Sequence, residues 1–160
     1  MTTLAASFHH AGHAVTAHLS RFHSLAAALR TDVWGTGEVV AALSRRKLAA
    51  GAKPPTIESR ADPEVASSIA TILCAGWVCE QLAAERGVAI RPDPTRSSGD
   101  FEAARAELQL AGIDLAIEPF QAAAAALLAE HWHRVQVVAE RLAQLGELSP
   151  EEVAAIVEAA

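Results

Sequence analysis

Two histidines, His9 and His13, stand four residues apart in an alanine-rich stretch near the start of the chain. Helix-favouring alanines flank them, so the stretch predicts an α-helix. On a helix, positions i and i+4 lie on one face, about 5–6 Å apart. Two imidazoles at that separation can hold one zinc ion at about 2.0–2.1 Å each. The spacing therefore indicates a helix that carries two metal ligands, and a pair of surface or packed histidines is the alternative interpretation.

The residue after the first histidine has a defined role in the zinc-peptidase motif His-Glu-x-x-His. In that motif it is a glutamate, which acts as the general base for the attacking water. Here the position is held by His10. Imidazole can act as a base, but its reach and direction differ from those of a carboxylate. His10 is thus either a replacement catalytic base or the sign of a lost one.

A catalytic zinc site needs a third protein ligand besides His9 and His13, together with an open position. Asp100 is a candidate, because it follows Gly99 in the first turn of a predicted helix. A carboxylate at this place also caps or complements a helix N-terminus without any metal. The spacing alone leaves both interpretations open.

The composition predicts one mainly helical domain over residues 1–160, rich in alanine and leucine and without tyrosine. Its net charge of −6 argues against nucleic acid or an anionic membrane as a partner. There is no run of 18 uninterrupted apolar residues, so we expect no membrane span. The start of the chain has no signal-peptide pattern, and Cys74 and Cys79 are spaced unfavourably for a disulfide. We therefore expect a cytoplasmic protein.

Turn and cap residues divide the chain into elements. We expect an α+β arrangement that is mainly α, with a small β-hairpin next to the metal helix. The hairpin pairs residues 23–29 with 38–43 around a turn at 32–37, and residues 44–60 form a loop. Helices are expected over residues 3–20, 62–86, 98–112 and 118–145, with a short final helix from Ser149-Pro150.

Three segments together resemble the peptidase domain of the FtsH family of ATP-dependent zinc metalloproteases. Residues 8–15 match the family's aromatic-His-Glu-Ala-Gly-His-Ala stretch at every position except the glutamate. Residues 72–81, Ile-Leu-Cys-Ala-Gly-Trp-Val-Cys-Glu-Gln, are similar to its Leu-x-Gly-Gly-Arg-x-Ala-Glu-Glu helix. Residues 98–104, which include Gly99, Asp100 and Phe101, are similar to its Asn-Asp-Leu-x-x-Ala segment. The resemblance continues through the closing helices and so covers nearly the whole chain in order.

This resemblance implies a function and a set of site residues. It makes His9, His13 and Asp100 the ligands of Zn²⁺, and it places Glu80 beside them in an orienting or structural role. The hairpin would correspond to the family's edge strand, which an extended peptide can join by backbone pairing. Trp34 near the turn would then be a substrate contact, and a packed or exposed hairpin aromatic is the alternative.

The expected function is a metallopeptidase-like domain that acts on peptides or unfolded protein. Its activity is expected to be weak or lost because His10 replaces the glutamate. An inactive pseudoprotease that binds a peptide or a partner is the alternative. The family's ATPase module and membrane segment do not occur in the given sequence. We therefore expect a separate ATPase partner or a homo-oligomer if the chain acts on folded proteins.

Overall fold

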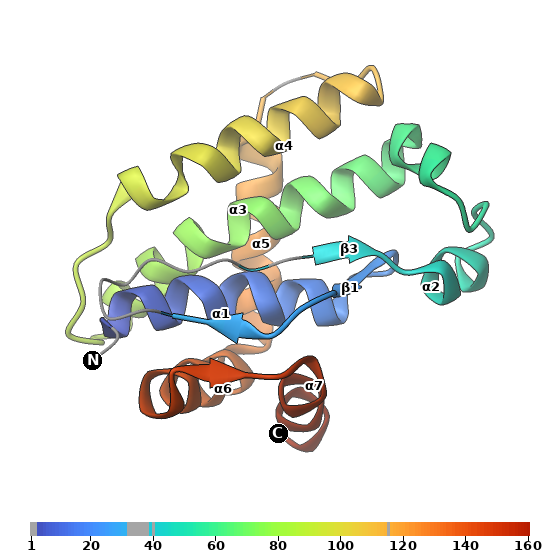
Figure 1. Cartoon of the computed structure of the whole chain (residues 1–160). Helices are drawn as coiled ribbons and strands as arrows, with labels where there is room; N and C mark the ends of the chain where they lie inside the picture. Colours follow the sequence, from blue (N-terminus) through green and yellow to red (C-terminus); the bar gives the residue numbers. More distant parts are fainter. Residues whose placement is uncertain (1–2, 32–38, 40, 115) are drawn as a thin grey trace.

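The computed structural model describes residues 3–31, 39, 41–114 and 116–160 (Figure 1). The architecture is mainly α with a small antiparallel β part, as the sequence predicts. The α-helices are α1 (Leu4–Leu19), α2 (Arg45–Ala50), α3 (Pro63–Glu85), α4 (Ser98–Leu110), α5 (Glu118–Glu130), α6 (Trp132–Leu145) and α7 (Pro150–Ala159). Within the described residues, two 3₁₀ helices, η1 (Ile57–Ala61) and η2 (Pro94–Ser97), precede α3 and α4.

Helices α1 and α3 form the centre of the molecule and lie side by side (Figure 1). Helix α4 packs on α3, α6 and α7 pack on α1, and α5 crosses behind the stack. Gly12 lets α1 and α3 approach closely, because a Cβ there would lie 2.6 Å from both the Ala75 carbonyl oxygen and the Cys79 Cβ. Twelve of the sixteen residues of α1 are buried. Any polar side chain in the middle of this helix is therefore held inside the protein.

Local signals explain where the two central helices begin. The Thr3 hydroxyl accepts a hydrogen bond from the Ala6 amide at the start of α1. The Asp62 carboxylate likewise accepts hydrogen bonds from the amides of Glu64 and Val65 at the start of α3, where Pro63 lies in the first turn. Polar caps satisfy the amides that have no partner within a helix. Both helix starts agree with the prediction.

The β part consists of two short antiparallel pairs within the described residues. Strand β1 (His23–Leu25) pairs with β3 (Ala41–Leu43), and β2 (Leu29–Arg30) pairs with β4 (Glu147–Leu148). The first pair confirms the predicted pairing of the two runs at residues 23–25 and 41–43. Leu29, which was predicted to belong to the first run, pairs with Leu148 of β4 instead. The predicted turn lies outside the described residues, and so does Trp34. The second pair joins segments more than a hundred positions apart, and no local pattern predicted it.

The predicted loop over residues 44–60 is wrong in part, because it contains α2 and η1. Ser44 caps α2 by accepting from the Lys47 amide. Leu48 is buried in a small cluster with Phe22 and Val65. The Lys47 ammonium donates to the carbonyl of His18, 2.9 Å away, at the end of α1. Tertiary contacts thus stabilise a helix of six residues that would not persist in isolation.

The single long helix predicted over residues 118–145 is also wrong. The chain leaves helical geometry at His131, where φ is −105° and ψ is 23°, and α5 and α6 run in different directions (Figure 1). The turn places the Trp132 ring on Phe8 of α1, with ring centroids 5.7 Å apart and nearly parallel planes. It also buries Val135 and Leu142 in the main core. Burial of these side chains against α1 overrides the continuous helical pattern.

Helix α3 is the one helix among the described residues that is long and apolar enough to cross a membrane, judged by length and composition alone. In the structure it packs against α1, α4 and α5. A core helix passes the same test, so the absence of a membrane span stays a prediction.

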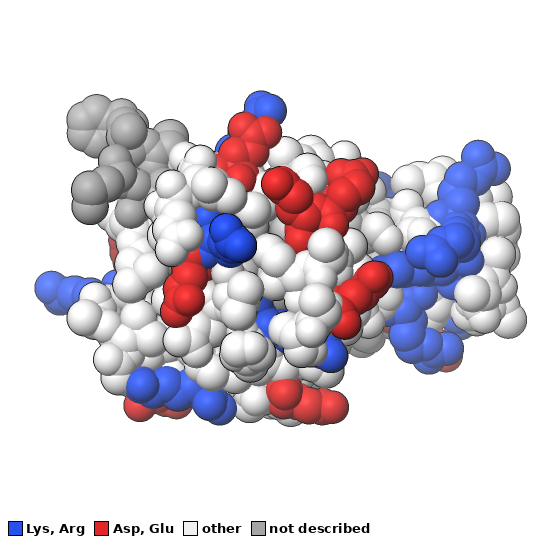
Figure 2. Space-filling view, turned by 90° about the horizontal axis from the view of Figure 1, so that it is seen from below, with Lys and Arg blue, Asp and Glu red and all other residues white. Residues whose placement is uncertain are grey.

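Charged side chains are distributed unevenly over the face formed by α6 and α7 (Figure 2). Acidic and basic side chains are both scattered across this face, and lysines and arginines gather most densely at the end of the molecule where α2 lies. Helix α2 itself contributes Arg45, Arg46 and Lys47. The overall charge of −6 therefore includes a local basic end.

Candidate metal centre

His9 and His13 lie on the buried face of α1 that packs against α3. Their exposed fractions are 3% and 5%, and their Nε2 atoms are 3.1 Å apart. The helical spacing expected from the sequence is thus present. It brings the same ring nitrogen of each histidine to one point.

The other ring nitrogen of each histidine is bonded to a group on α3. His9 Nδ1 lies 2.8 Å from Glu80 Oε1, and His13 Nδ1 lies 2.7 Å from the Ile72 carbonyl oxygen. Both partners only accept hydrogen bonds, so each Nδ1 donates its proton. Each neutral imidazole then directs an Nε2 lone pair at the other one. Two facing lone pairs repel unless a cation lies between them.

Asp100, in the first turn of α4, supplies the third atom. Its Oδ2 lies 3.4 Å from His9 Nε2 and 3.3 Å from His13 Nε2. Three tetrahedral ligand atoms at about 2.0 Å from a zinc ion are about 3.3 Å from one another. The group of His9, His13 and Asp100 could therefore hold a metal ion.

The electrostatics of this group also favour a cation. Burial lowers the pKa of His9, but the carboxylates of Asp100 and Glu80 outweigh that effect, so the pKa of His9 is raised. Burial likewise raises the pKa of Asp100, but hydrogen bonds with His13 and His9 outweigh it and hold the pKa well below its usual range. Positive charge is thus stabilised between these side chains. A bound metal ion would supply it permanently.

Gly76 of α3 makes the room that the histidines need. A Cβ at this position would lie 2.6 Å from His9 Cε1 and 2.7 Å from His9 Nε2, and closer still to His13 Nε2. Real Cβ atoms essentially never approach other atoms so closely. A glycine in the middle of a helix costs about 0.5–1 kcal/mol relative to alanine. Here it lets the α3 backbone lie directly against the two ligand nitrogens.

Glu80 is completely buried on α3, and both of its oxygens are occupied. Oε1 accepts from His9, while Oε2 lies 2.8 Å from Arg96 Nη1 and 3.0 Å from the Asp93 amide nitrogen. Burial raises the pKa of Glu80, but the hydrogen bonds from His9 and Arg96 outweigh it and lower the pKa. The resemblance assigned Glu80 a position near the site. The structure places it against His9.

His10 is buried beside the centre without a polar partner. It is 4% exposed, and its ring stands perpendicular to that of His9 with centroids 5.4 Å apart. Among the described residues, neither of its ring nitrogens has a hydrogen-bond partner. Burial, and next the electrostatic influence of the neighbouring His9 and His13, lower its pKa to about 3. The ring is therefore neutral near pH 7 and a weak acceptor of protons.

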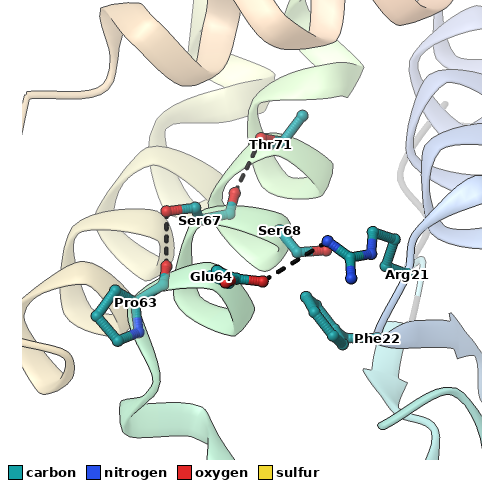
Figure 3. A pocket seen from close by; sticks show the side chains of 7 residues that line it. All are labelled: Arg21, Phe22, Pro63, Glu64, Ser67, Ser68 and Thr71. Carbon is teal, nitrogen blue, oxygen red and sulfur yellow. Dashed lines mark hydrogen bonds and ion pairs between the residues drawn. The ribbon is translucent and has the colours of Figure 1, made fainter. Parts of the chain in front are cut away.

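A separate pocket of about 460 Å³ opens where the end of α1 meets the start of α3 (Figure 3). Its hydroxyl groups are engaged locally, because Ser67 donates to the Pro63 carbonyl and Thr71 to the Ser67 carbonyl. Arg21 and Glu64 form an ion pair of 3.6 Å across it. None of its lining residues belongs to the metal centre. This pocket therefore contributes no residue to the metal centre.

Sequence reasoning missed Ile72, Gly76, Asp93 and Arg96 as parts of the site. An isolated glycine inside a predicted helix lowers helix propensity and often has a packing reason, so Gly76 carried a signal. Arg96 and the Asp93 amide carried none, since a loop arginine looks the same whether it is solvated or bonded to a buried carboxylate. Their roles depend on how the chain folds back on α3.

Comparisons with known proteins do not identify a family for this chain. No protein-family model matches it, and no curated protein matches it. The likeness to the FtsH peptidase domain stays a prediction based on the three motifs. The group that could hold a metal ion follows from the geometry of His9, His13 and Asp100.

Proposed function

We propose that this chain is a zinc-binding, metallopeptidase-like domain of the FtsH protease type. The observation that carries the proposal is the convergence of three ligand atoms, His9 Nε2, His13 Nε2 and Asp100 Oδ2, at 3.1, 3.3 and 3.4 Å from one another. Two imidazole nitrogens and one carboxylate oxygen are a ligand set that zinc accepts. Three protein ligands leave a fourth position open, as catalytic zinc sites do.

The residues around the ligands support the same interpretation. Glu80 and the Ile72 carbonyl fix the donor nitrogens of His9 and His13, which is how outer hydrogen bonds orient metal-binding histidines. Gly76 keeps the adjacent backbone clear of both rings. A zinc ion held here would supply Lewis-acid activation of a peptide carbonyl and of water.

The weak point of the centre as an enzyme is position 10. Peptide hydrolysis also needs a side chain that accepts a proton beside the metal and passes it to the leaving amine. The His10 ring is bulkier than a carboxylate, and it is enclosed without a polar partner among the described residues. Its two nitrogens do not reproduce the two oxygens of a glutamate. We therefore expect metal binding to be retained and peptidase activity to be weak or undetectable.

The replacement at position 10 favours a second candidate function, a pseudoprotease that binds peptides or a partner without cutting them. The pseudoprotease can hold the metal or be metal-free, and it differs from the first candidate in that it does not cut. The first candidate acts on a peptide or an unfolded protein, and the second binds a peptide or a partner.

The test compares zinc-loaded wild-type protein with His10→Glu on unstructured casein. A gain of about tenfold or more, equal to roughly 1.4 kcal/mol in the barrier, supports a peptidase centre that lacks its base. The matched control is His133→Glu, because His133 is an exposed histidine on α6. Zinc-loaded His10→Glu without any gain favours the pseudoprotease. Robust cleavage by the unaltered chain would overturn the claim that the base is missing.

A further inference from the structure

Glu80 connects the histidine helix to the segment that delivers Asp100. Its Oε1 accepts from His9 on α1, and its Oε2 accepts from the Asp93 amide and forms an ion pair with Arg96 Nη1, 2.8 Å away. Both of these partners lie at η2, which leads directly into α4 and Asp100. Asp100 in turn reaches back to His9. These contacts form a closed ring of interactions, and its last link runs through the position where a metal ion would be held.

Charge balance explains why an arginine is needed in this ring. Glu80 has an exposed fraction of 0%, and a buried carboxylate without a compensating charge is strongly destabilising. The guanidinium stays protonated at any pH that proteins meet. Arg96 is only partly exposed, at 23% of its side chain, and lies 2.8 Å from Glu80 Oε2. Arg96 therefore balances Glu80, which leaves the carboxylate of Asp100 to balance a metal ion.

We propose that Arg96 is a positioning residue of the metal centre. Through Glu80 it holds His9 with its Nδ1 protonated and its Nε2 free, and through η2 it holds the start of α4 so that Asp100 meets the histidines. This inference rests on the proposed function, and it adds a residue that the resemblance did not assign. Its consequence is that metal affinity depends on a side chain that never touches the metal.

The experiment measures zinc affinity by competition with a chromophoric chelator at fixed pH. Loss of a direct partner of a metal ligand typically weakens binding by about 10–100-fold. Because Arg96 acts on His9 through Glu80, we expect a loss toward the lower end of that range for Arg96→Gln. Arg96→Lys keeps the positive charge and is expected to recover most of the affinity. The matched control is Arg91→Gln, an exposed arginine in the same loop, which should leave the affinity unchanged. Wild-type affinity in folded Arg96→Gln would overturn the proposal.

A second readout needs no metal. In nitrogen-detected NMR of metal-free protein at alkaline pH, where the imidazole is neutral, His9 should exist mainly as the Nδ1-protonated tautomer in the wild type and as a mixture of tautomers in Arg96→Gln. An unchanged tautomer in that variant would contradict the proposal. If the wild type binds no zinc, the proposed function fails, and the tautomer of His9 alone then decides the role of Arg96.

A third readout covers the case in which Arg96→Gln does not fold. In the wild type, the Asp93 amide should exchange with solvent more slowly once zinc closes the ring. Unchanged exchange of that amide at saturating zinc would overturn the coupling between η2 and the metal.

Discussion

Replacing Gly76 by alanine tests whether the close approach of α3 to the two histidines is what shapes the metal centre. The new Cβ would lie 2.6 Å from His9 Cε1 and 2.7 Å from His9 Nε2. Carbon contacts are comfortable at about 3.5–4.0 Å. The rings of His9 and His13, or the two helices, must therefore move by roughly 1 Å. Neither ring has free space, because both are buried between α1 and α3.

The size of the effect follows from two opposing contributions to stability. Overpacking a tight core typically costs about 1–3 kcal/mol, while alanine gains about 0.5–1 kcal/mol over glycine inside a helix. We expect the steric cost to win, for a net loss of about 1–2 kcal/mol in the free energy of unfolding. Metal–ligand distances in genuine sites stay within about 0.2 Å of their usual values. Zinc affinity should therefore fall by at least about 100-fold, which is roughly 2.7 kcal/mol.

The assay combines urea unfolding of metal-free protein with a chelator-competition measurement of the zinc dissociation constant. Gly99→Ala is the matched control, because Gly99 lies next to Asp100 and a Cβ there meets nothing within 4 Å. That variant should keep its zinc affinity and be as stable as the wild type or slightly more stable. Wild-type stability and wild-type zinc affinity in Gly76→Ala would refute the reasoning.

Two further predictions concern the scaffold. Asp62→Ala removes the cap of α3, whose carboxylate accepts from the amides of Glu64 and Val65, and should cost about 1–2 kcal/mol. Asp62→Asn keeps the cap and loses only the partly exposed ion pair with Lys53, so urea unfolding should show a much smaller loss, and equal losses would contradict the capping role. Burial, followed by the charge of Lys47, lowers the pKa of His23 from 6.5 to about 4. The unfolded chain therefore binds a proton that the folded chain does not, and stability falls as the pH drops from 6.5 to 4. His23→Gln should make that decline shallower by up to about 1.4 kcal/mol per pH unit, and an identical slope would show that His23 is not a source of it.

Local patterns predicted much of the helical framework. Thr3, Asp62-Pro63 and Ser149-Pro150 mark helix starts through hydrogen bonds and backbone restrictions that act within a few residues. Gly146 likewise ends α6 in the left-handed conformation, at φ 77°. The break at His131 has no such signal, because no proline or glycine stands there. It arises from contacts such as that of Trp132 with Phe8, which no local pattern contains.

The site shows the same division between local and long-range information. The i, i+4 spacing in the sequence directly predicted that His9 and His13 share a helix face. Asp100 was assigned as a ligand, and Glu80 as its neighbour, only through the resemblance. Arg96 and Ile72 act across the fold on side chains far away in sequence. Their contributions become visible only when α1, α3 and η2 are seen together.

The measurement that tests the central claim most directly is the metal content of the purified protein by elemental analysis. After loading with zinc and removal of the excess, the wild type should retain about one zinc per chain, the content of one site with three protein ligands. His13→Ala and Asp100→Ala should each lose it while they keep helical circular dichroism. A wild type without stoichiometric zinc, or folded variants that retain it fully, would contradict the assignment of His9, His13 and Asp100 as a metal centre.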